Sequence, residues 1–128
     1  MRIASMIARY LLGVGFVIFG LNGFLHFIPQ PPMAPGPMVD WMTVMTKTNY
    51  MMPVFAFELL GGLLLLVNRY VPLALTILGP ILVNILVFHV LLQPAGLPPA
   101  IVFVILWFLV SYSVRSAFVG IFQNRVAA

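Results

Sequence analysis

The sequence predicts an all-α integral membrane protein. The expected fold is a four-helix transmembrane bundle with a short amphipathic interfacial helix in its first outer loop. Of the 128 residues, 63% are hydrophobic and only 6% are charged, whereas soluble domains carry about 25% charged residues. The mean hydropathy is +1.17. These values exclude a soluble globule, because too little polar surface is available, and they exclude a disordered chain because it is far too hydrophobic.

The first half of the chain predicts two spans. A helix needs about 20 apolar residues to cross the hydrocarbon core of a bilayer. Residues 10–39 contain no charged residue, and the apolar part of this stretch predicts a first span over about 10–28, which Pro29 stops. The second span is predicted over 51–67, where Glu58 is the one charged residue.

The second half predicts two more spans. Residues 70–114 contain no charged residue, and this stretch is too long for one helix and long enough for two. A proline- and glycine-rich segment at 93–99 divides it. The third and fourth spans are therefore predicted over about 71–92 and 99–119, within a single membrane domain that covers residues 1–128.

The first outer loop, residues 29–50, is expected to contain structure of its own. Residues 29–37 are proline-rich and cannot be helical, whereas 38–48 fit a short amphipathic helix that lies on the membrane surface. Its apolar face consists of Met38, Trp41, Met42 and Met45. Trp41 is then expected at the level of the lipid headgroups.

Six of the eight methionines fall between residues 33 and 52, in or near this loop. Thioethers are soft ligands for Cu(I), which makes a copper site one interpretation of the loop. The favoured interpretation is that methionine forms the apolar face of the interfacial helix. No metal site is predicted, and whether the loop binds copper stays open on sequence grounds.

The basic residues predict the orientation. Five of the six precede the first span, separate the second from the third, or follow the fourth: Arg2, Arg9, Arg69, Arg115 and Arg125. Only Lys47 lies on the other side, together with Asp40. The positive-inside rule then places both termini in the cytoplasm. Nucleic-acid binding is not expected, because the arginines form no clustered basic stripe. Arg9 and Arg115 are expected to snorkel to the cytoplasmic surface.

Two short motifs resemble the DoxX-like family of small bacterial membrane proteins. The first is FVIFGLNGFLHFIP at residues 16–29, and the second is FELLGG at 57–62, followed by an arginine in the turn at 68–70. The resemblance implies a multi-pass four-helix bundle in the bacterial inner membrane. Named members of the family include quinone-linked thiosulfate oxidoreductase subunits, and others look like components of oxidative-stress and copper-handling systems. Fold transfers between such relatives better than function does.

The polar residues within the spans are predicted to gather in the outer half of the membrane. At a rise of about 1.5 Å per residue, their depths form two layers: His26 with His89 near the surface, and Asn22, Glu58, Asn84 and Trp107 below them. Glu58 is the candidate catalytic residue, because an acid inside a membrane marks a functional site by default. The other five are candidate cofactor-binding residues. Asn84 and His89 are about 140° apart on an ideal helix, so one of them is expected to face lipid headgroups or a partner.

Each of these residues also has a structural interpretation. Glu58 can be protonated, hydrogen-bonded to Asn22 or Asn84, and serve only to hold the helices together. The asparagines can act as interhelical contacts, and the histidines as interfacial residues near helix ends. The glycines of the spans are predicted to permit close contact between helices.

Two functions follow from these interpretations. The first is a quinone-interacting, redox-associated membrane subunit, in which the polar side chains bind the quinone and Glu58 moves a proton. The sequence has no haem, flavin or iron–sulfur motif and no cysteine, so electrons must come from another subunit. The alternative is a non-catalytic accessory or assembly subunit of a larger membrane complex. Partners are then the lipid bilayer and either other membrane subunits or further copies of the chain. A transporter is disfavoured, because no inverted repeat is visible.

Overall fold

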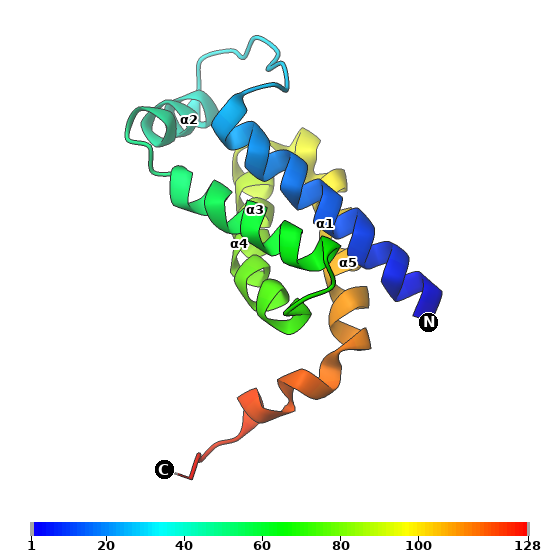
Figure 1. Ribbon diagram of the computed structural model, residues 1–128. Helices are drawn as coiled ribbons and strands as arrows, with labels where there is room; N and C mark the ends of the chain where they lie inside the picture. The colour runs from blue at the N-terminus through cyan, green and yellow to red at the C-terminus, as the bar shows by residue number, and fades with distance from the viewer. Residues whose placement is uncertain (1, 128) are drawn as a thin grey trace.

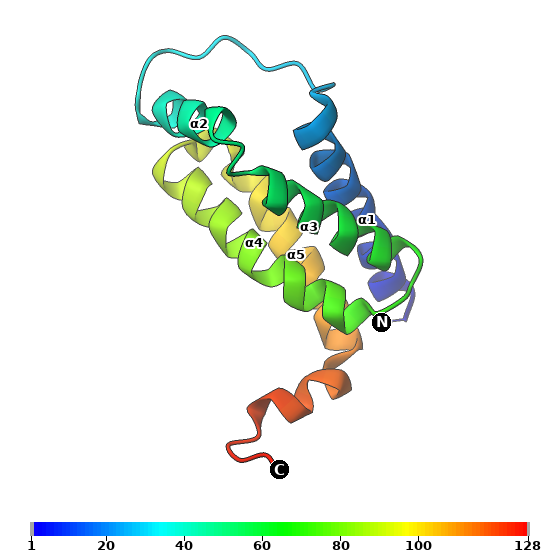
Figure 2. The ribbon, with the colours of Figure 1, turned by 60° about the vertical axis from the view of Figure 1, so that its left-hand side comes forward.

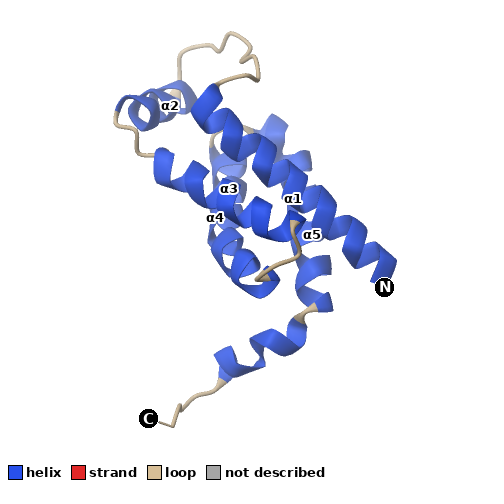
Figure 3. Ribbon diagram, in the orientation of Figure 1, coloured by secondary structure: helices blue, strands red, loops and turns tan. Residues whose placement is uncertain are grey.

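The computed structural model describes residues 2–127, and throughout this range the regular elements are helices (Figures 1 and 3). Five are α-helices: α1 (Arg2–Leu25), α2 (Pro37–Lys47), α3 (Met52–Leu66), α4 (Val71–Leu91) and α5 (Leu97–Ser113). Two short 3₁₀ helices complete the order, η1 (Pro94–Gly96) before α5 and η2 (Arg115–Phe122) after it.

Four of the α-helices form a bundle (Figure 2). α1 packs against α3 and α5, and α4 packs against the same two helices from the other side. The core between them is apolar, and its largest fully buried side chains are Phe16, Leu12, Leu65, Leu75, Leu78 and Val110. η2 leaves this bundle at the end of α5 and extends away from it (Figures 1 and 2).

Three helical segments are long and apolar enough to cross a membrane: α1, α4, and α5 together with η1. α3 has only 15 residues and reaches the required length only together with α2, from which it is bent by 86°. The described chain therefore contains three candidate spans, or up to four if α2 and α3 are counted as one. Apolar helices of this length indicate a membrane protein.

The helix boundaries agree with the predicted spans in the middle of the chain and differ at both ends. α1 begins at Arg2 rather than near residue 10, because apolar residues on both sides of Arg9 continue the helix through this charge. It ends at Leu25, since His26 adopts a left-handed conformation with φ of 51°. α5 ends at Ser113 instead of continuing to 119, and the tighter η2 follows.

Glycine allows α1 and α3 to approach closely, as predicted. A Cβ atom at Gly20 would lie 2.8 Å from the Leu59 backbone nitrogen. A Cβ atom at Gly62 would lie 2.8 Å from the Val17 nitrogen and 2.9 Å from the Gly13 carbonyl oxygen. Because these neighbours are backbone atoms, a side chain at either position would push the two helices apart.

α2 presents the predicted apolar face to the rest of the protein. Met38, Trp41, Met42 and Met45 are half-buried, whereas the polar residues of this helix are exposed. The Trp41 ring packs on Phe88 near the end of α4, with the ring centroids 4.8 Å apart. Trp41 of this apolar face therefore contacts the bundle itself, which the sequence had not indicated.

Four of the five arginines lie where α1 begins, α3 ends, α4 begins and α5 ends: Arg2, Arg9, Arg69 and Arg115. Arg9 does not simply reach toward solvent, as the snorkelling prediction supposed. Its Nη1 donates a hydrogen bond to the Leu65 carbonyl oxygen of α3, and its guanidinium lies 4.5 Å from the Tyr10 ring centroid. The same carbonyl oxygen also accepts a hydrogen bond from the Asn68 backbone nitrogen over 3.3 Å, so Arg9 adds a second donor at the C-terminal end of α3.

Candidate functional site

Glu58 lies inside the helical bundle. Glu58 is only 5% exposed. It shares the buried stripe of α3 with Gly61, Gly62 and Leu65. Gly61 faces Leu78 of α4, so this stripe lies against apolar neighbours. Glu58 Oε2 has no hydrogen-bond partner among the residues that the structure describes. The expected hydrogen bond to Asn22 or Asn84 is not formed there.

Asn22 and His26 together end α1 instead of pointing at Glu58. The backbone nitrogen of His26 donates to the Asn22 carbonyl oxygen over 2.8 Å. The Asn22 side-chain oxygen accepts a second hydrogen bond, also of 2.8 Å, from the backbone nitrogen of Ile28. The His26 side chain is exposed. These two residues are therefore occupied in closing the helix, where the left-handed backbone of His26 terminates it.

Asn84 faces away from the bundle. Its side chain is exposed, and its Nδ2 donates to the Pro80 carbonyl oxygen of the same helix over 3.1 Å. This agrees with the expectation that Asn84 and His89 cannot both face the bundle axis. The Asn84 side-chain oxygen is left free to accept a hydrogen bond from a group outside the bundle.

His89 and Trp107 each contact a backbone carbonyl. The Nδ1 of His89, which is half-buried, lies 3.1 Å from the Gln93 carbonyl oxygen, and the ring packs against Gly96 in the turn before α5. The Nε1 of Trp107 donates to the Leu75 carbonyl oxygen of α4 over 2.9 Å. Trp107 therefore joins α5 to α4 at a carbonyl group five residues before Pro80.

The six predicted site residues consequently do not assemble into one pocket in the described chain. The two predicted layers placed them by depth, but the rotation of each helix directs them to different surroundings. Asn22 and His26 meet at the end of α1, Trp107 and His89 hold backbone groups, and Asn84 faces outward. Of these six residues, only Glu58 has a buried side-chain oxygen without a hydrogen-bond partner in the described chain.

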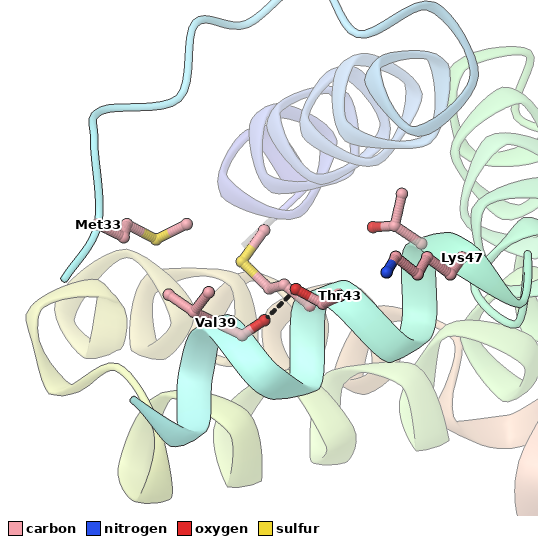
Figure 4. A pocket seen from close by; sticks show the side chains of 6 residues that line it. Met33, Val39, Thr43 and Lys47 are labelled. Atoms are coloured by element: carbon pink, nitrogen blue, oxygen red, sulfur yellow. Dashed lines mark hydrogen bonds between the residues drawn. The ribbon is translucent and has the colours of Figure 1, made fainter. Parts of the chain in front are cut away.

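Two surface grooves accompany this arrangement, and none of the six residues lines either of them. The first, of about 310 Å³, lies between α2 and the preceding loop and is lined by Met33, Val39, Met42, Thr43, Thr46 and Lys47. Figure 4 shows Met33 of the loop near Val39 of α2. One turn further along α2, the Thr43 hydroxyl donates a hydrogen bond to the Val39 carbonyl oxygen over 2.7 Å. Only two of the six clustered methionines reach this groove. Within residues 2–127, no group of three or more histidines or acids is placed to hold a metal ion.

The second groove, of about 220 Å³, lies between the start of α1 and the end of α5. Its lining consists of Arg2, Ser5, Leu109, Tyr112, Ser113 and Arg115. We call it the arginine groove. The positions of Arg2 and Arg115 near opposite ends of the chain gave no signal for it, because the pairing of α1 with α5 is not visible in the sequence.

Sequence reasoning also missed one further buried oxygen, the hydroxyl of Ser111, which like Glu58 Oε2 has no partner in the described chain. Ser111 is one of several hydroxyl residues near the end of α5, and nothing in its sequence context distinguishes it.

Comparison of the chain with protein-family models, with curated proteins and with solved structures finds no match.

Proposed function

We propose that this chain is a DoxX-like membrane subunit of a quinone-linked redox complex, in which Glu58 exchanges a proton inside the helical bundle. The unpartnered buried carboxyl of Glu58 is the observation that supports this proposal. A carboxyl that served only to join helices would need a hydrogen-bond partner, because an unsatisfied buried polar group is costly. Burial of such a group without structural use favours a functional role.

The proton balance of quinone chemistry gives Glu58 a defined task. Reduction of a quinone to a quinol takes two electrons and two protons. In the proposal, Glu58 gives one proton to a quinone oxygen and is then reprotonated from water, and water also supplies the proton for the second quinone oxygen. The electrons come from a partner subunit, since the chain has no cysteine and no haem, flavin or iron–sulfur motif. In the absence of quinone the carboxyl is stable in its neutral form, because an isolated carboxylate is very costly to bury.

The proposal includes four spans with both termini in the bacterial cytoplasm. α1, α3, α4 and α5 each cross the membrane, and α2 lies along the outer surface. Four arginines at one end of the bundle, and Arg125 in the segment that extends from the same end, support this orientation. An export-dependent reporter enzyme fused after Ala128 is expected to be inactive, whereas the same reporter inserted after Gly96 is expected to be active. The reverse pattern would overturn the orientation, and activity at both positions would overturn the number of spans.

The role of Glu58 can be tested by infrared difference spectroscopy. When quinone is reduced electrochemically in the purified membrane protein, a carboxyl C=O band is expected to appear or shift. This band should disappear in Glu58→Gln, which keeps the shape of the side chain but holds no exchangeable acid proton. Asp40→Asn serves as the control, because Asp40 is the only other acid and is exposed on α2. A band that persists in Glu58→Gln would exclude proton exchange at this residue.

The outward position of Asn84 favours a second candidate function, that of an accessory or assembly subunit. An amide that faces lipid is stabilised when a neighbouring membrane helix supplies a hydrogen bond. Native purification from membranes with mass spectrometry of lipids and proteins separates the two functions. Bound quinone together with a redox subunit would support the first. A stoichiometric membrane protein without quinone would support the second.

A further inference from the structure

We propose that the arginine groove binds the phosphate headgroup of an anionic phospholipid. Two guanidinium groups line this groove together with three hydroxyl-bearing residues and one leucine. Its volume of about 220 Å³ is below the 300–1,000 Å³ that is typical of sites enclosing a whole small molecule. The groove therefore has room for a headgroup whose tails lie outside it.

The charge around the groove is uncompensated. The whole chain has only two acidic residues, Asp40 and Glu58. Asp40 is on α2 at the opposite end of the bundle, and Glu58 is buried inside it. No acidic side chain is therefore available at this end to pair with Arg2 or Arg115. Two cations that face one cavity without an acid favour an anion as its occupant.

The hydrogen-bond donors that remain free in the groove identify the groups that would bind this anion. Arg115 donates one hydrogen bond to the Tyr112 carbonyl oxygen over 2.9 Å, and its guanidinium lies 4.2 Å from the Tyr112 ring centroid. Stacking on Tyr112 fixes the plane of the guanidinium, and a guanidinium has five N–H donors in all. Arg2 makes no side-chain hydrogen bond to the rest of the described chain. The two arginines can therefore each offer a pair of donors to phosphate oxygens.

The two serines of the groove are expected to contribute less to phosphate binding than the arginines. Ser5 donates its hydroxyl to the Arg2 carbonyl oxygen over 3.1 Å, and Ser113 donates to the Val110 carbonyl oxygen over 2.6 Å. Each hydroxyl would have to give up this hydrogen bond to donate to a phosphate. We therefore expect Arg2 and Arg115 to account for most of the affinity.

The surroundings of the groove favour a lipid over a free phosphate ion. The groove lies at the ends of two helices of membrane-spanning length, α1 and α5. Large apolar side chains are exposed on the same two helices within two turns of the groove: Ile3, Met6, Ile7, Ile105 and Phe108. Acyl chains attached to a phosphate in the groove could lie along these side chains. Beyond the groove, η2 exposes Val119, Ile121 and Phe122, which is typical of a segment that lies in the membrane interface.

The test uses the full-length chain in neutral detergent and native mass spectrometry. With added phosphatidylglycerol, we expect one retained lipid per chain. The double variant Arg2→Gln/Arg115→Gln is expected to lose about tenfold or more in affinity, because two close cation–phosphate contacts are removed. Arg69→Gln/Arg125→Gln is the matched control, since it removes the same number of charges and neither residue lines the groove.

Three results would overturn the proposal. Equal lipid retention by the double variant would show that the groove is not the site. An equal loss in Arg69→Gln/Arg125→Gln would show that net charge, rather than the groove, determines binding. Complete displacement of the lipid by millimolar inorganic phosphate would identify a free anion as the ligand. Retention of phosphatidylglycerol in excess phosphate, together with loss in the double variant alone, would support the lipid site. This test is independent of the activity proposed for Glu58.

Discussion

Replacing Gly20 or Gly62 by alanine is expected to lower the free energy of unfolding by about 3 kcal/mol, the upper end of the usual overpacking range. The new methyl group would lie 2.8 Å from a backbone nitrogen of the facing helix in either variant. Backbone atoms cannot rotate away as side chains can, so α1 and α3 must separate. This separation removes packing along the most extensive helix contact in the bundle. Thermal unfolding of the purified protein in detergent measures the effect.

Two other glycines provide controls of graded severity. A Cβ atom at Gly79 in α4 would lie 3.3 Å from the edge of the Trp107 ring, and one at Gly36 would have no neighbour within 4 Å. Gly79→Ala and Gly20→Ala gain the same helix propensity, about 1 kcal/mol. A difference in stability between these two variants therefore measures the effect of packing. We expect Gly36→Ala to be close to neutral and Gly79→Ala to have a small effect. Equal stability in Gly20→Ala and Gly79→Ala would contradict the close approach of α1 and α3.

Replacing Glu58 by methionine is expected to stabilise the protein while abolishing its proposed proton exchange. An unsatisfied buried polar group costs about 1–3 kcal/mol, and methionine has a similar length with no group that needs a partner. The unfolding temperature of Glu58→Met should therefore rise by several degrees. Glu58→Gln retains a buried polar group, so its unfolding temperature should stay at or below that of the parent chain.

A loss of stability in Glu58→Met would contradict the interpretation that the Glu58 carboxyl has no hydrogen-bond partner. It would mean that Glu58 has a hydrogen-bond partner in the membrane, supplied by a ligand, a water molecule or another subunit. Gain of stability with loss of the infrared signal would instead show the usual exchange of stability for activity at a functional site.

The helices could be predicted from the sequence because their determinants are local. Apolar runs bounded by the turn at Arg69 and by the proline- and glycine-rich segment at 93–99 located α3 and α4 to within a residue or two. The spacing of Met38, Trp41, Met42 and Met45 identified the inner face of α2. The C-terminal boundary of α1 was harder to predict from the sequence. It depends on the left-handed conformation of His26, which a non-glycine residue seldom adopts.

The polar site was predicted less well because depth does not determine direction. The rise per residue placed Asn84 near the level of Glu58, but the rotation of α4 directs its amide outward. Trp107 finds the Leu75 carbonyl oxygen only because α5 packs beside α4. The arginine groove depends on a similar long-range pairing, between α1 and α5. Such pairings are properties of the packed bundle that no single segment encodes.

The brevity of α3 has a consequence for the surrounding bilayer. Its 15 residues extend roughly 22 Å, against a hydrocarbon thickness of about 30 Å. In the topology proposed above, in which α3 crosses the membrane, this hydrophobic mismatch would draw the two leaflets closer together beside α3. Glu58 lies six residues from Met52, roughly 9 Å along the helix, so thinning brings interfacial water nearer to the carboxyl. In the proposed function, the short helix would thereby shorten the path of a proton between that water and Glu58.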